Sequence, residues 1–261
     1  MINSFSMPLL QVSDLSLTLG AQQILREISF AVEEGEVIGL IGPNGSGKTT
    51  LFNVLSGFLK VTSGHIEFHD RDITMSSPAR RAKEGIGRVF QNFGIFREMT
   101  LEENVLVALE ALSKEDRKTL VGDPSGGRSM KHCMQKKVEE TLALVGLKEK
   151  AHEKACSLSG GQMRLLEIAR TLASGKELFL LDEPTAGVSP KMTNDIASLI
   201  RELQKEKKTV LVIEHDLPFI AKICDRVLVL DLGQIVISGT PQEVHQHKKL
   251  REIYFGADPT E

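Results

Sequence analysis

A glycine-rich segment near the N-terminus has the residue types that bind the phosphates of a nucleoside triphosphate. It fits the phosphate-binding loop G-x-x-x-x-G-K-[ST], and its residues are Gly42, Pro43, Asn44, Gly45, Ser46, Gly47, Lys48, Thr49 and Thr50. Glycines let successive backbone N–H groups face a β-phosphate, and the positive end of a following helix adds to the attraction. Lys48 would place its charge on the β- and γ-phosphates, and the Thr49 hydroxyl suits a Mg²⁺ ligand. A structural glycine turn can match the same pattern, but the predicted strand before it and helix after it favour a nucleotide site.

Two adjacent carboxylates follow the apolar run at residues 178–181. Carboxylates at the end of a buried strand are costly unless they are used. Asp182 would hold Mg²⁺ through a water molecule, and Glu183 would act as the general base for the water that attacks the γ-phosphate. A strand that ends in Asp-Glu-Pro can also be an ordinary helix cap, with Pro184 as a turn residue. The glycine loop upstream favours the catalytic interpretation.

A third segment, Leu158-Ser159-Gly160-Gly161-Gln162, lies between these two motifs. At the start of a helix, the serine hydroxyl and the glycine N–H groups form an anion site. Lys48 already serves one set of phosphates, so a second anion site in the same chain implies a second nucleotide.

The three motifs in this order resemble the ATP-binding-cassette (ABC) ATPases, and the resemblance covers the whole chain. It implies ATP and Mg²⁺ as cofactors and a head-to-tail dimer, in which residues 159–162 close over the ATP of the opposite subunit. It also implies that His215 contacts the γ-phosphate and holds the water and Glu183. Gln91 would touch Mg²⁺ and the attacking water, and would link hydrolysis to the lobe that contacts a membrane partner. Outside this order of motifs, a lone histidine or glutamine at a strand end is usually an ordinary residue.

Two positions depart from the family pattern. The family usually has an aromatic ring for adenine before the glycine near position 20, where this chain has Leu19. Base stacking on a ring is worth about 1–3 kcal/mol, so we expect weak adenine affinity and weak preference for ATP over GTP. Ser189 stands where an aspartate is common, which removes a charge and predicts altered coupling across the dimer.

The elements that must position these residues alternate between strands and helices, which predicts a largely parallel sheet. The fold class is therefore α/β: a P-loop ABC-ATPase core with an N-terminal antiparallel β subdomain and an inserted helical lobe. We expect one nucleotide-binding domain at 7–256, a lobe at about 100–172, and tails at 1–6 and 257–261. The chain has no heptad run, so a chromosome-structure ATPase with a coiled-coil arm is disfavoured. The expected strands are 9–19, 24–32, 37–41, 66–68, 86–90, 178–181, 209–213, 227–230 and 234–238, and the expected helices are 49–56, 101–112, 137–147, one from about 159, and 191–206, with a surface loop at 122–131.

Composition narrows the class of partner. With a net charge of −3, the chain has no basic excess for binding nucleic acid. Its three cysteines, Cys133, Cys156 and Cys224, lack metal-ligand spacing and are expected to be reduced thiols. No apolar run approaches the roughly 18 residues that cross a bilayer, and the N-terminus does not resemble a secretory signal. We therefore expect a cytoplasmic protein that reaches the inner face of the cell membrane by docking to permease subunits.

Four segments, at 90–104, 164–170, 213–216 and 253–256, resemble importers for branched-chain amino acids and related amides such as urea. This resemblance implies integral membrane permease subunits, a homo- or heterodimer of ABC subunits, and a solute-binding protein as an indirect partner. Lipopolysaccharide-export ATPases share much of the pattern and are the alternative. A soluble ABC ATPase of translation or DNA repair would usually carry two cassettes or a coiled coil. A P-loop kinase would have no use for residues 158–162.

Overall fold

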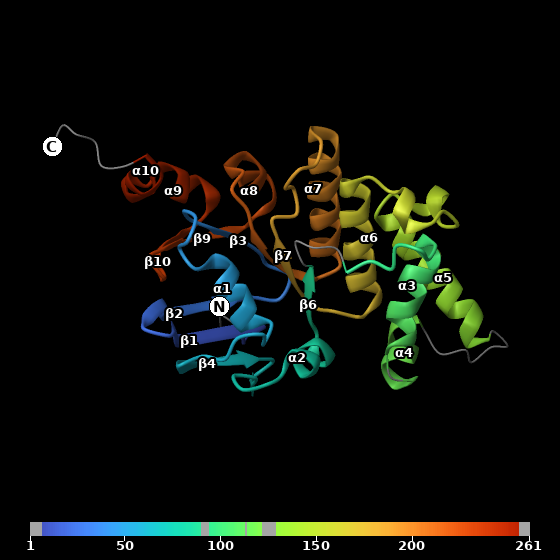
Figure 1. Cartoon of the computed structure of the whole chain (residues 1–261), viewed down its shortest axis with the longest axis horizontal. Helices are drawn as coiled ribbons and strands as arrows, with labels where there is room; N and C mark the ends of the chain where they lie inside the picture. The colour runs from blue at the N-terminus through green and yellow to red at the C-terminus, as the bar shows by residue number, and fades with distance from the viewer. Residues whose placement is uncertain (1–6, 90–93, 113, 122–128, 256–261) are drawn as a thin grey trace, which may run out of the picture.

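The computed structural model describes residues 7–89, 94–112, 114–121 and 129–255. Within these residues, the chain forms two β-sheets with a group of helices at one side (Figure 1). The larger sheet has the strand order β10-β9-β3-β8-β7-β6 and is parallel except for β10 at its edge. Its strands are β3 (Val37–Ile41), β6 (Ile86–Val89), β7 (Leu178–Asp182), β8 (Thr209–Ile213), β9 (Arg226–Asp231) and β10 (Gln234–Gly239).

Strand β7 shows how the larger sheet separates two cores. Its side chains alternate between the two faces of the sheet. Leu178 and Leu180 belong to the core that contains α1 (Lys48–Leu55) and the smaller sheet. Phe179 and Leu181 belong to the core on the opposite face, with α6 (Gly160–Ala173) and α7 (Pro190–Lys205). Both faces are buried, which explains the uninterrupted apolar sequence of the strand.

The smaller sheet is antiparallel, with the order β2-β1-β4-β5. Its strands are β1 (Leu10–Leu19), β2 (Gln22–Val32), β4 (Ser63–Phe68) and β5 (Arg71–Asp72). Helix α1 lies between the two sheets, and Leu51, Phe52, Val54 and Leu55 are buried there. The helix that follows the glycine loop is thus fixed from both sides.

The helical lobe lies beyond β6 and β7 (Figure 1). It contains α3 (Leu101–Glu110), α4 (Lys114–Val121), α5 (Met130–Leu144) and the short 3-10 turns at Lys148–Lys150 and Ala155–Ser157. Helix α6 joins the lobe to the core, because it packs against α3, α5 and β6. This arrangement confirms the predicted α/β core with an antiparallel N-terminal sheet and a helical lobe.

Several predicted boundaries were wrong. Helix α5 begins at Met130, seven residues before the expected start, because the Ser129 side chain caps it by accepting from the backbone N–H of His132. The C-terminal part of the expected 122–131 loop is therefore helical, while residues 122–128 lie outside the described residues. The described part of the predicted strand 86–90 is strand β6, Ile86–Val89, and Phe90 lies outside the described residues.

Helix α4 was not predicted, and neither were four other short helices. They are α2 (Pro78–Glu84), α8 (Leu217–Ile223), α9 (Pro241–Gln246) and α10 (Lys248–Phe255). Figure 1 shows α8, α9 and α10 together on the side of the core away from the lobe. None of the described helices has the length and apolar character required to cross a membrane.

Candidate functional site

The glycine loop connects β3 to α1, and its backbone requires glycine at two points. A Cβ at Gly42 (φ 150°) would lie 2.0 Å from the carbonyl oxygen of Leu230. Gly47 (φ 108°) is the N-cap of α1, and a Cβ there would lie 3.0 Å from Leu25 Cδ2. The loop is therefore pressed against β9 and β2. The first backbone N–H groups of α1 have no acceptor within the helix, as at every helix start, and they are available to an anion.

Lys48 is folded back onto the loop. Its Nζ donates to the carbonyl oxygens of Gly42 and Pro43, at 2.8 Å each, and the residue is buried. Burial lowers the pKa of this amine, while the negative charges of Glu183 and Asp182 oppose the shift. A nucleotide that binds here must offer phosphate oxygens in place of the two carbonyls.

The hydroxyl of Ser46 supports a ligand role for this loop. The Ser46 Oγ is buried and has no hydrogen-bond partner among the described residues. Asn44, Gly45 and Thr49 are exposed, and Thr50 is half-buried. The loop thus combines an unsatisfied hydroxyl with accessible backbone, as a phosphate site requires.

Glu183 and His215 lie at the carboxyl ends of the neighbouring strands β7 and β8. His215 Nε2 is 3.1 Å from Glu183 Oε1, and both side chains are partly exposed. The Glu183 backbone N–H donates to the carbonyl of Ile213 at 3.0 Å, and its φ of 47° is left-handed. Non-glycine residues in this conformation are uncommon and concentrate at functional sites. The structure therefore brings together the two residues that were predicted as catalytic base and γ-phosphate switch.

Asp182 is buried, and its carboxylate is held by Arg88 of β6. Arg88 Nη2 donates to Asp182 Oδ2 at 3.2 Å, and both side chains are 7% exposed. Burial raises the pKa of Asp182, and the Arg88 charge opposes this effect. Arg88 Nη1 also donates to Asn53 Oδ1 and Ser56 Oγ, which connects β6 to α1.

No group of three or more His, Cys, Asp or Glu side chains among the described residues could hold a metal ion. A Mg²⁺ ion at Thr49 and Asp182 would therefore depend on phosphate oxygens and water for its remaining ligands, which is how Mg²⁺ usually binds at nucleotide sites. The hydroxyl and carboxylate present are oxygen donors that suit this ion.

Glu214 is a functional candidate that the sequence analysis missed. Its Oε1 accepts from the backbone N–H of Thr185 at 2.9 Å and from Thr185 Oγ1 at 2.5 Å, while Oε2 accepts from the His215 N–H at 3.1 Å. Glu214 is 4% exposed. It thereby links the loop after Glu183 to the strand end that carries His215. An acidic residue directly after a buried apolar strand was the available signal.

The segment 159–162 lies at the start of α6. The Ser159 side chain accepts from the Gln162 N–H at 3.3 Å, and Gln162 Oε1 accepts from the Ser159 N–H at 3.1 Å, so the two residues form a capping box. Ser159 and Gly160 are exposed, whereas Gly161 is buried and a Cβ there would lie 2.6 Å from Met192 Cγ. Figure 1 places α6 on the opposite side of β6 and β7 from α1. This anion site is therefore not brought to the glycine loop of its own chain.

The remaining predicted positions have different outcomes. Leu19 ends β1 at the tip of the β1–β2 hairpin and is 46% exposed. The β2 arm of this hairpin carries Leu25 against Gly47 of the loop. Ser189 is the N-cap of α7 and accepts from the Met192 N–H. Gln91 lies outside the described residues. The adenine and coupling roles of these positions stay predictions.

Comparison with known proteins gives consistent matches. The family model described as ABC transporter matches residues 25–186. The branched-chain amino acid transport ATP-binding protein LivG of Salmonella typhimurium is 37% identical over 253 residues, covering 96% of this chain and 99% of LivG. The lipopolysaccharide export ATP-binding protein LptB of Acidithiobacillus ferridurans is 36% identical over 250 residues, covering 95% of this chain and 97% of LptB.

A solved structure of the ADP conformation of MJ1267, an ATP-binding cassette of an ABC transporter, has a TM-score of 0.83 and 34% identity. The superposition covers 97% of this chain and all of that one. The similarity therefore extends through both sheets and the helical lobe.

Proposed function

The chain belongs to the ABC transporter family and is an ATPase cassette, and from this premise we propose that it powers import of branched-chain amino acids or related small solutes. Residues 7–256 would act as one nucleotide-binding domain, with an inserted lobe at 100–172. The observation that carries the catalytic part is the 3.1 Å contact between Glu183 and His215 beside the glycine loop.

In this proposal, Glu183 takes the proton of the water that attacks the γ-phosphate, and His215 orients Glu183 and contacts the γ-phosphate. Lys48 exchanges its two carbonyl acceptors for β- and γ-phosphate oxygens. Glu214 positions His215 by accepting from its backbone N–H. All four side chains lie at the carboxyl edge of the parallel strands, where α/β sheets usually bind ligands.

Thr49 and Asp182, together with Gln91, would hold a Mg²⁺ ion that neutralises charge on the transferred phosphoryl group. Arg88 holds the Asp182 carboxylate at the end of β7. Because Arg88 also donates to Asn53 of α1, it fixes this carboxylate relative to that helix.

Hydrolysis would require two cassettes. Ser159 and Gly160 are exposed at the start of α6, and this helix lies on the opposite side of β6 and β7 from α1, which follows the glycine loop (Figure 1). In a head-to-tail dimer, this helix start would cover the ATP of the opposite subunit. The partner cassette is a second copy of this chain or a related subunit.

The transport part of the proposal follows from the match to LivG over almost the full length of both chains. The chain would bind integral membrane permease subunits at the cytoplasmic face of the membrane, with a solute-binding protein as an indirect partner. Lipopolysaccharide export is the second candidate, because LptB matches with nearly equal identity and coverage.

ATP binding and hydrolysis by the purified chain test the catalytic part. Wild-type protein should bind ATP and hydrolyse it. The hydrolysis rate per chain should rise with protein concentration, because the active species is a dimer. Lys48→Ala should bind ATP weakly, because the loop loses its only lysine charge at the phosphates. Equal ATP affinity in the two proteins would contradict the site.

Reconstitution tests the transport part. The tagged chain should copurify with permease subunits from membranes of its source, and the complex in proteoliposomes should accumulate labelled leucine when ATP and the solute-binding protein are supplied. ATP-dependent release of lipopolysaccharide, without leucine uptake, would favour the export alternative.

A further inference from the structure

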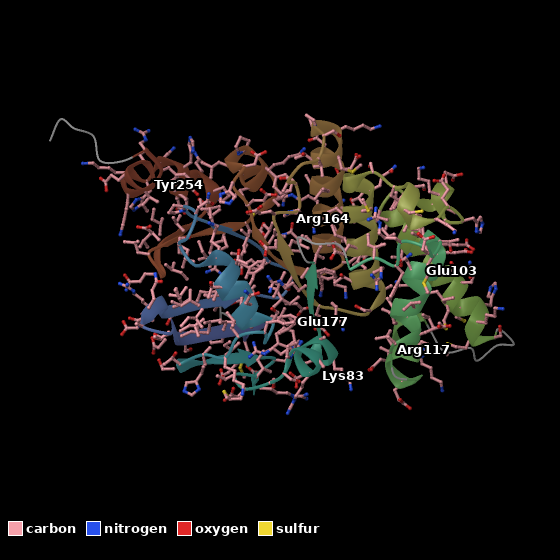
Figure 2. The ribbon with its side chains drawn as sticks, viewed as in Figure 1. Lys83, Glu103, Arg117, Arg164, Glu177 and Tyr254 are labelled. Carbon is pink, nitrogen blue, oxygen red and sulfur yellow. The ribbon has the colours of Figure 1, made fainter. Side chains whose placement is uncertain are left out.

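A side chain of the C-terminal helix α10 reaches the nucleotide loop. The hydroxyl of Tyr254 accepts a hydrogen bond from the backbone N–H of Gly42 at 2.9 Å. The two residues are 212 positions apart in the chain. Tyr254 is half-buried, and it packs against the core on the face of the larger sheet that also carries α6 and α7. Figure 2 labels it among the C-terminal helices.

Gly42 is the first residue of the glycine loop and occupies a confined position. The pairing of β3 with β9 ends at Ile41 and Val229, so the Gly42 N–H lies beyond the sheet ladder. The residue is buried, and a Cβ there would meet the Leu230 carbonyl at 2.0 Å. A buried N–H in this position needs an acceptor, and Tyr254 supplies it.

The carbonyl of the same residue is an acceptor for Lys48 Nζ at 2.8 Å. One residue therefore connects the C-terminal helix to the lysine that must move when nucleotide binds. When Lys48 turns to the phosphates, its bond to the Gly42 carbonyl is lost. The bond from the Gly42 N–H to Tyr254 can persist and keep the start of the loop in place.

We propose that Tyr254 is a positioning residue for nucleotide binding, whose hydroxyl holds Gly42 so that the loop is ready for phosphates. The inference rests on the proposed phosphate site at residues 42–50. Because linkage is reciprocal, docking of α10 strengthens nucleotide binding, and bound nucleotide strengthens the docking of α10. The C-terminal helix thereby becomes a place where an event outside the site can change nucleotide affinity.

The ring makes a separate contribution to packing, so the hydroxyl must be tested alone. Tyr254→Phe removes only the acceptor and leaves the Gly42 N–H without its partner. Ile253→Val is the matched control, because Ile253 is half-buried on the same helix and packs against the same core. A purely structural role predicts similar small losses of thermal stability in both variants and unchanged nucleotide affinity.

The chain carries its own probe for this contact. Tyr254 is the only tyrosine, and the chain has no tryptophan. Tyrosine fluorescence of the full-length wild-type protein, corrected for absorption by the nucleotide, therefore reports on this side chain alone. Because bound nucleotide strengthens the docking of α10, ATP with Mg²⁺ should make this fluorescence harder to quench with acrylamide. Quenching that stays the same or increases when ATP is saturating would overturn the inference.

ATP titrations of the variants and hydrogen exchange at the Gly42 amide complete the test. Tyr254→Phe should bind ATP about fivefold more weakly, the equivalent of one net hydrogen bond, and its Gly42 amide should exchange faster. Ile253→Val should match wild type in both. Equal ATP affinity and equal Gly42 exchange in Tyr254→Phe and wild type would overturn this inference but not the proposed phosphate site. Failure of wild type to bind ATP would overturn the proposed site as well.

Discussion

Arg88 and Asp182 form a buried ion pair at the junction of β6 and β7, with Nη2 3.2 Å from Oδ2. The pair connects the carboxylate proposed for Mg²⁺ to α1, because Arg88 also donates to Asn53 of that helix and to Ser56, its C-cap. Burial raises the pKa of Asp182 in spite of the nearby arginine. The Arg88 charge therefore favours the ionised carboxylate against the effect of burial.

Removal of Arg88 should destabilise the fold. Arg88→Met leaves Asp182 buried without its cation, and we expect a loss of about 3–5 kcal/mol in the free energy of unfolding. The double variant Arg88→Met with Asp182→Leu removes both charges and should recover much of that loss. Urea denaturation of the nucleotide-free chains measures both values. A single variant as stable as wild type would contradict a structural role for the pair.

The same variant has a predicted pH dependence. A carboxyl group whose folded pKa lies above its unfolded value of 3.8 keeps its proton longer in the native state. Stability from that proton is present at low pH and is lost as pH rises through the folded pKa. Without Arg88 the folded pKa rises further, so the stability difference between Arg88→Met and wild type should shrink on acidification. Denaturation at a series of pH values below neutrality tests the direction.

Glu183→Gln should separate binding from hydrolysis. The amide preserves the shape and a hydrogen bond to His215 but cannot accept the proton of water, so ATP should bind while hydrolysis falls by about two to four orders of magnitude. A stable ATP-bound dimer should accumulate and be visible by size-exclusion chromatography. Glu177→Gln, immediately before the other end of β7, is the control and should hydrolyse ATP normally. Full turnover by Glu183→Gln would end its assignment as the base.

His215→Ala should keep ATP binding and lose hydrolysis, because Glu183 loses its 3.1 Å contact and the γ-phosphate loses a donor. His152→Ala alters an exposed histidine in the lobe and serves as the control. Steady-state ATPase assays and equilibrium ATP titrations give the two readouts. Normal hydrolysis by His215→Ala would leave this histidine with a structural role only.

Leu19→Tyr should strengthen ATP binding if the hairpin tip faces the adenine. A gain of about 1 kcal/mol corresponds to about a fivefold change in affinity, with better discrimination against GTP. Met75→Tyr places a ring at another exposed position and should change neither value. If Leu19→Tyr also changes neither, another residue supplies the adenine contact and Leu19 is misplaced in this role.

Motifs and local elements of this protein follow from its sequence alone. The spacing of Gly42, Gly47 and Lys48 specifies a phosphate loop because the requirement is local: a tight backbone turn followed by a helix start. The continuous apolar run at 178–181 specifies a doubly covered strand, and its carboxyl end locates Asp182 and Glu183. The short helices α2, α8 and α9 were missed because one or two turns are too few for a helical period to be recognised. Their capping residues, Ser77, Asp216 and Thr240, were the remaining local signal.

Only the tertiary structure decided which side chains support the site. Arg88 meets Asp182 from 94 residues away, and Tyr254 meets Gly42 from 212 residues away. Glu214 reaches Thr185 across two strands that pair in parallel, β7 and β8. Residue periodicity indicates which face of an element is buried but not which element covers it. The partners of buried polar groups depend on the order of strands in the sheet and on where the C-terminal helices pack, and the sequence does not encode these as a local pattern.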